Sequence, residues 1–236
     1  MLPFLRPCLA ILTSSLLLTP PPSFALTTPL SDEAVREAYF LGQRNDESTR
    51  AFFAPYLLTF QCPKTGPFVS EVEVYTPFSQ LVELSSRRNN YSAQQAAEDY
   101  HRGTDSVFIR VRIQFTSTYG PPAFFASYPP STDRSSDPPR RANFSRDFRI
   151  RVSQDGHGVE PLDLHHELTN TPPTGHFPFD PDEVGSWIYA SDSPMTGWMV
   201  WLQFDAAELA DDSAQVEIFG PNDLHLAASF DLSRLR

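Results

Sequence analysis

The stretch VFIRVRIQFT, residues 107–116, decides the fold. Its side chains alternate between two rows, and this period of two is typical of a β-strand with one buried face. We expect one row to face a hydrophobic core and the other row to face solvent. The core row is Val107, Ile109, Val111, Ile113 and Phe115, and the solvent row is Phe108, Arg110, Arg112, Gln114 and Thr116.

Shorter stretches show the same alternation, and turn residues such as Asp155-Gly156 separate them. Short alternating strands joined by Pro- and Gly-rich turns favour an antiparallel β-sandwich, for which an immunoglobulin-like architecture is our first expectation. The Cys…Trp…Cys pattern of true immunoglobulin domains is absent from the sequence. The predicted strands are 71–75, 107–116, 148–152, 198–204, 214–218 and 224–230, and the residues expected in the core include Ile109, Val111, Trp198, Val200 and Phe230.

About three helices are expected in the N-terminal half of this mainly β domain. Ser31 precedes two acidic residues and can cap a first helix that ends near Gly42. Thr76, followed by proline, starts a helical insert of two helices at about 76–103. A proline-rich loop is expected at about 119–143.

The N-terminal segment 1–25 is typical of a secretory signal peptide. Arg6 gives a positive start, Leu9 to Leu18 form a short apolar run, and Ala25 ends a small-residue cleavage pattern. The apolar run is about half the length needed to cross a bilayer. We therefore expect cleavage after Ala25, a secreted or periplasmic single domain at 26–236, and no membrane span after cleavage. An uncleaved membrane anchor is the alternative.

Composition narrows the classes of partner and of cysteine chemistry. The net charge of −11 repels phosphate backbones, so nucleic acid is not an expected partner. Signal cleavage would remove Cys8 and leave Cys62 alone, and we expect Cys62 to be a buried thiol at the end of a strand. Asn90 and Asn143 match the glycosylation pattern, which matters only in a eukaryotic host.

Histidines and acidic residues gather in the segment 163–180, DLHHELTNTPPTGHFPFD. Imidazole and carboxylate groups can bind zinc or calcium, but a zincin helix needs a second histidine where this chain has Asn170. Adjacent histidines also point to opposite faces of an extended chain. Because of this and the prolines, we expect a connecting loop and no cofactor. The candidate metal ligands are His157, Asp163, His165, His166, Glu167 and His176.

Four arginines and a tryptophan are predicted on outward strand faces. If their strands are neighbours, the arginines form a basic patch that can bind a carboxylate or phosphate by forked hydrogen bonds. The alternative is that the arginines pair across the sheet with Glu71, Glu73 and Glu217. The candidate ligand-binding residues are Arg110, Arg112, Arg149, Arg151 and Trp201.

The motifs that would indicate common catalytic chemistries are missing. The sequence has no nucleophile elbow, no P-loop and no dinucleotide-binding glycine motif. The hypothesis that follows is an exported, non-enzymatic binding or scaffolding module of the cell envelope or extracellular space, with a protein or glycan partner. The alternative is a secreted metal-assisted hydrolase that uses the Asp163–His176 region.

Overall fold

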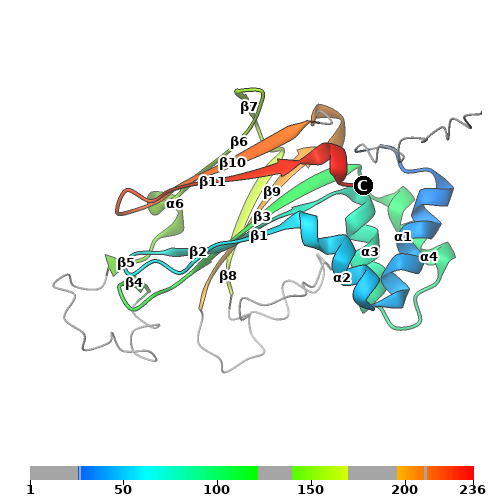
Figure 1. Cartoon of the computed structure of the whole chain (residues 1–236), viewed down its shortest axis with the longest axis horizontal. Coiled ribbons are helices and arrows are strands. Elements are labelled where there is room, and N and C mark those ends of the chain that lie inside the picture. Colours follow the sequence, from blue (N-terminus) through cyan, green and yellow to red (C-terminus); the bar gives the residue numbers. More distant parts are fainter. Residues whose placement is uncertain (1–25, 27, 122–139, 170–195, 210–211) are drawn as a thin grey trace, which may run out of the picture.

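The structure is a computed structural model that describes residues 26, 28–121, 140–169, 196–209 and 212–236. It combines helices with two antiparallel sheets (Figure 1). The expected signal segment, most of the expected proline-rich loop, Asn170 and His176 lie outside the described residues. Among the described helices, none is long and apolar enough to cross a bilayer.

The larger sheet has five strands, and every neighbouring pair in it is antiparallel. β8 and β1 form its two edges. In spatial order the strands are β1 (Leu57–Thr59), β2 (Phe68–Tyr75), β3 (Ser106–Gln114), β9 (Gly197–Asp205) and β8 (Asp163–Thr169).

The smaller sheet has four antiparallel strands, and β10 lies between β11 and β6. Asp155 and Gly156 both have positive φ in the tight turn between β6 and β7, as a primed hairpin turn requires. The strands are β11 (His225–Asp231), β10 (Ser213–Phe219), β6 (Arg149–Gln154) and β7 (His157–Val159), and a short parallel pair joins β4 (Tyr119–Gly120) to β5 (Arg140–Arg141).

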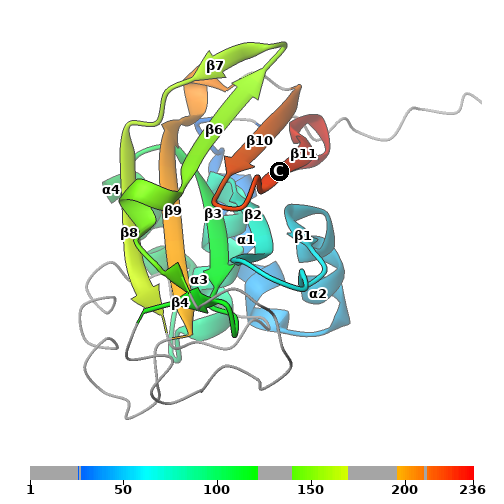
Figure 2. The ribbon, with the colours of Figure 1, turned by 90° about the vertical axis from the view of Figure 1, so that its left-hand side faces the viewer.

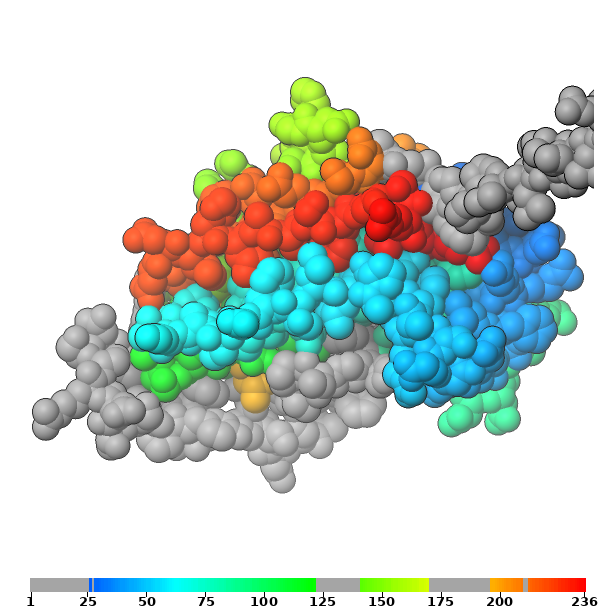
Figure 3. Space-filling model, in the orientation of Figure 1, coloured from blue at the N-terminus to red at the C-terminus, as the bar shows by residue number. Residues whose placement is uncertain are grey.

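One hydrophobic core joins the two sheets. Its residues include Val111 and Val200 from the five-stranded sheet and Val216 from the four-stranded sheet. In Figure 3, the surface of the C-terminal strand β11 adjoins that of β1 and β2, with the N-terminal helices beyond one end. The predicted burial of core side chains is confirmed for Ile109, Val111, Trp198, Val200 and Phe230.

Helices α1, α2, α3 and α4 gather at one end of the sheets, as Figure 1 shows. Thr76 and Ser79 form a capping box that starts α3, and Ser92 and Gln95 form another that starts α4. A Cβ on Gly42 would meet the Val82 carbonyl oxygen at 2.2 Å, so glycine permits the close packing of α1 on α3. The elements are α1 (Asp32–Arg44), α2 (Glu47–Phe53), η1 (Ala54–Tyr56), α3 (Pro77–Arg87), α4 (Ala93–Arg102), α6 (Phe144–Asp147), η2 (Ala206–Glu208) and η3 (Leu232–Arg234).

Two local predictions are wrong. Cys62 is exposed and lies beyond β1, because that strand ends at Thr59 and the chain leaves the sheet before Pro63. The segment 163–180 is not a loop throughout, since residues 163–169 form β8. Within 163–180, the prolines that indicated a loop all follow Thr169, so none interrupts the strand itself.

Candidate functional site

Two rows of side chains cross the face of the five-stranded sheet that is turned away from the core. The residues in each row lie directly opposite one another on neighbouring strands. We call this surface the charged face. Its first row is Leu57, Glu73, Arg110, Trp201 and His165, and its second row is Thr59, Glu71, Arg112, Met199 and Glu167.

The centre of the charged face is buried, so the predicted exposure of Arg110 and Arg112 is wrong. Each arginine is only 1% exposed. Arg110 pairs with Glu73, and Arg112 Nε lies 3.2 Å from Glu71 Oε2. Both partners come from β2, where Glu71 lies opposite Arg112 and Glu73 lies opposite Arg110. The alternative reading, cross-strand pairing with Glu71 and Glu73, is confirmed.

Aromatic rings cover the guanidinium of Arg110. Its central carbon lies 5.2 Å from the ring centroid of Tyr75 and 5.3 Å from that of Trp201. The two rings are 5.9 Å apart. Trp201 lies in the outward row, as predicted, but its side chain is half-buried and packs on Arg110. The π face of the Trp201 ring stabilises the positive charge of Arg110.

Helix α3 adds a second buried acid–base pair beside the first. Glu83 Oε1 lies 2.6 Å from Arg87 Nη2, one helical turn further along the chain. Burial raises the pKa of Glu83 to about 7, an effect that Arg87 and Arg110 oppose and that the charge of Glu73 reinforces. Burial also raises the pKa of Glu73. Glu83 therefore changes charge near neutral pH.

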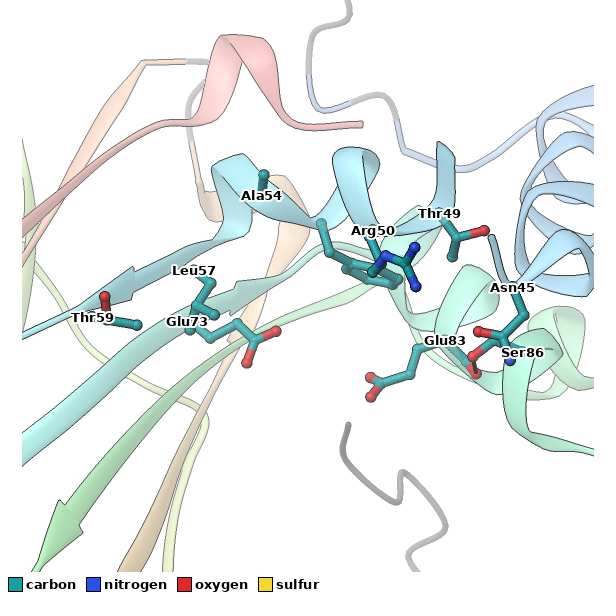
Figure 4. Close-up of a pocket in the computed structure, with 10 residues that line it drawn as sticks. Asn45, Thr49, Arg50, Ala54, Leu57, Thr59, Glu73, Glu83 and Ser86 are labelled. Carbon is teal, nitrogen blue, oxygen red and sulfur yellow. Dashed lines mark hydrogen bonds between the residues drawn. The ribbon is translucent and has the colours of Figure 1, made fainter. Parts of the chain in front are cut away.

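A pocket opens where these carboxylates meet the helices. Its volume is about 360 Å³, and it lies between α2, η1, β1, β2 and α3. Figure 4 shows the side chains of Glu73 and Glu83 extending into this space from β2 and α3. Apolar side chains, hydroxyl groups, an amide and the guanidinium of Arg50 complete the lining. The lining residues are Asn45, Thr49, Arg50, Phe53, Ala54, Leu57, Thr59, Glu73, Glu83 and Ser86.

The pocket residues were not predicted as a site. Most of them come from α2, β1 and α3, which are distant in sequence from β3. The sequence contains one relevant signal. Glu71 and Glu73 are two residues apart, and so are Arg110 and Arg112. That match indicates paired strands, but it does not indicate the adjacent cavity.

The four arginines do not form one patch, because the strands that carry them are not neighbours. Arg149 and Arg151 lie on β6, which belongs to the other sheet from β3. Both are exposed and their guanidinium carbons lie 4.9 and 5.8 Å from the ring centroid of Phe219. Arg151 lies opposite Glu217 in the register of β6 and β10.

The metal candidates divide between different surfaces. Asp163, His165 and Glu167 alternate on one face of β8, while His166 faces the other way and stacks on Phe144 at 4.3 Å between ring centroids. Partial burial lowers the pKa of His166, and burial raises the pKa of Glu167. His157 lies on β7 in the other sheet. Within the described ranges, no three histidine, cysteine or acidic side chains are grouped to hold a metal ion.

Comparison with known proteins returned no relatives: no family model, curated protein or solved structure matches this chain. Inference about function therefore depends on the pocket and the charged face.

Proposed function

We propose that this chain is an exported, non-enzymatic binding module whose ligand occupies the pocket lined by Glu73 and Glu83. The observation that carries the proposal is a cavity of about 360 Å³ in which apolar surface lies beside two buried carboxylates. Ligand sites in proteins have this size and this mixture of apolar walls with a few polar groups.

The charges around the pocket favour a neutral ligand. Among the described residues, Glu71, Glu73 and Glu83 are matched by Arg112, Arg110 and Arg87. At the rim, Arg50 pairs with Glu47 at 2.6 Å. A cationic ligand would therefore find little net negative charge, because each carboxylate already has a positive neighbour.

Carboxylate oxygens with remaining acceptor capacity favour a ligand that donates hydrogen bonds. Thr49 and Ser86 add hydroxyl groups to the same lining, and Phe53 adds an aromatic ring. Sugars offer both a row of hydroxyl donors and apolar C–H faces. We therefore propose that the ligand is a neutral polyhydroxylated molecule, the glycan class of partner in the envelope or extracellular space.

We also propose that the two sheets form an immunoglobulin-like sandwich that serves as the frame for this pocket. Support comes from the shared core and from the antiparallel pairing in both sheets. Export is proposed from the sequence of residues 1–25. Leu26, which would begin the mature chain, is buried in the shared core.

The test is a thermal melt of the mature protein with a panel of neutral mono- and disaccharides, and with alkylammonium and carboxylate compounds as the other arms. A ligand present at a hundred times its dissociation constant should raise stability by roughly 3 kcal/mol. Ala54→Trp should abolish the rise, because it fills the pocket without changing a charge. Ala207→Trp on η2 is the matched control, since Ala207 is also exposed and lies outside the pocket.

A rise caused by sugars and lost in Ala54→Trp alone supports the proposal. A rise confined to the charged compounds, or one that survives Ala54→Trp, contradicts it.

A further inference from the structure

Among the described strands, β8 is an edge strand of the five-stranded sheet. It pairs with β9 on one side, and no strand of the described chain pairs with its other side. Figure 2 shows β8 running along this outer edge beside β9. An open edge presents unpaired backbone donors and acceptors and is a template for pairing with another strand.

Strand β8 and the residue just before it, Leu162, carry exposed apolar side chains. Leu162, Leu164 and Leu168 are 62%, 44% and 40% exposed. Leu164 and Leu168 lie opposite the core residues Leu202 and Trp198 of β9, so they continue the apolar face of the sheet beyond the part that the other sheet covers. This apolar strip needs a cover that has matching apolar side chains.

The sequence of β8 is complementary to itself. In an antiparallel pair centred on His166, Leu164 lies opposite Leu168 of a second copy, and His165 lies opposite Glu167 of a second copy. Each match occurs twice because of the symmetry. Both apolar pairs fall on the apolar strip, and both acid–base pairs fall on the charged face.

Two other symmetric registers, centred on His165 and on Glu167, are unfavourable. A continuous two-fold sheet requires opposing side chains to share a face, so the centre must be a residue. Centring on His165 would place Asp163 opposite Glu167, and centring on Glu167 would place two copies of that carboxylate opposite each other. Like charges directly opposite each other destabilise a sheet.

We propose that the mature chain forms a two-fold symmetric dimer through antiparallel pairing of β8 with β8 of a second copy, centred on His166. The two five-stranded sheets then become one continuous sheet. The pocket is lined from β1 and β2, at and beside the opposite edge, so both ligand sites stay open in the dimer. The dimer is independent of the proposed function, since either can hold without the other.

The first test is sedimentation velocity of the mature chain over about 1 to about 100 µM. His165→Glu places a carboxylate opposite Glu167 and should weaken dimerisation about tenfold, because two favourable cross-strand pairs become repulsive. The swap His165→Glu with Glu167→His restores an imidazole opposite each carboxylate and should restore the dimer. His157→Glu on β7 is the matched control and should leave the dimer intact, because His157 is also exposed and lies in the other sheet.

The second test fixes the register. In a Cys62→Ser background, His166→Cys should form a cross-link between copies under oxidation, while His157→Cys should not. Dimers with this pattern of rescue and cross-linking support the proposal. A chain that stays monomeric at the highest concentration, or a dimer that is indifferent to His165→Glu and to the swap, overturns it.

Discussion

Glu73 on β2 lies directly opposite Arg110 on β3, and the two form a buried ion pair on the face of the sheet that is turned away from the core. A buried charge that loses its partner is far more costly than a pair replaced as a unit. Glu73 also lines the pocket. The alignment of β2 with β3 therefore fixes the position of one pocket wall.

Removing one member of this pair should destabilise the fold strongly. We expect Arg110→Met to lower the free energy of unfolding by about 3–5 kcal/mol, because it leaves buried carboxylates without their cation. Urea unfolding of the mature chain measures this loss. Adding Glu73→Gln to Arg110→Met should recover a large part of the lost stability.

Arg149→Met is the matched control and should change stability by less than about 0.5 kcal/mol, because Arg149 is exposed. Equal losses for Arg110→Met and Arg149→Met would show that the pair is not important for stability.

Stability should depend on the protonation of Glu83. Its pKa of about 7 in the fold lies above the value of 4.5 for an unperturbed glutamate, so the folded state holds this proton more tightly than the unfolded state. Proton binding by Glu83 therefore contributes to the free energy of unfolding. This contribution is complete below about pH 4.5 and is lost as the pH rises to about 7.

Glu83→Gln removes this dependence. Relative to the unaltered chain, the variant should gain up to roughly 3 kcal/mol of stability between pH 5 and pH 8. Urea unfolding at several pH values measures the difference. Glu98→Gln, an exposed change on α4, should leave the pH profile as it is. A constant difference between Glu83→Gln and the unaltered chain across this range would show that Glu83 keeps an ordinary pKa.

Zinc should leave the melting temperature of the mature protein unchanged. Adjacent His165 and His166 point to opposite faces of β8, and His157 belongs to the other sheet. The measurement is a thermal melt with zinc and then with chelator, on protein purified without a histidine tag. A rise of several degrees that His165→Ala together with His176→Ala abolishes would contradict this expectation and favour the hydrolase.

We expect the chain to be exported, with a mature form that begins near Leu26 and contains one reactive thiol. Cleavage after Ala25 removes Cys8, and Cys62 is exposed in the fold. N-terminal sequencing and thiol titration of the native, exported protein measure both. An intact Met1 in the cytoplasm, or a thiol that reacts only after unfolding, would count against this account.

The alternation of side chains along the strands predicted the core correctly. Odd- and even-numbered residues of one strand lie on opposite faces of the sheet, so the sequence is enough to assign each side chain to a face. The alternation in VFIRVRIQFT separated Ile109 and Val111 from Arg110 and Arg112, and the structure keeps that separation. It did not predict that the second face is also buried. The position of a residue in the strand determines its face, but the burial of that face depends on what covers it. Arg110 is covered by Tyr75 and Trp201.

The pocket was beyond sequence reasoning for a related reason. Glu83 occupies a helical position whose neighbours Leu81 and Val82 pack into the core of the helices, so its own burial depends on how α3 meets the sheet. The contact with Arg87 is local and could be predicted from its spacing of one helical turn. The approach of Glu73 could not, because it requires the packing of two separate elements.

We propose that the pocket beside Glu73 and Glu83 holds a neutral polyhydroxylated ligand. The most direct measurement is isothermal titration of the mature protein with the sugar that stabilises it best, on the unaltered chain, Ala54→Trp and Ala207→Trp. We predict saturable binding to the unaltered chain and to Ala207→Trp, with affinity lost at least tenfold in Ala54→Trp. Equal binding by all three proteins, or binding by none while a charged compound does bind, would contradict the account.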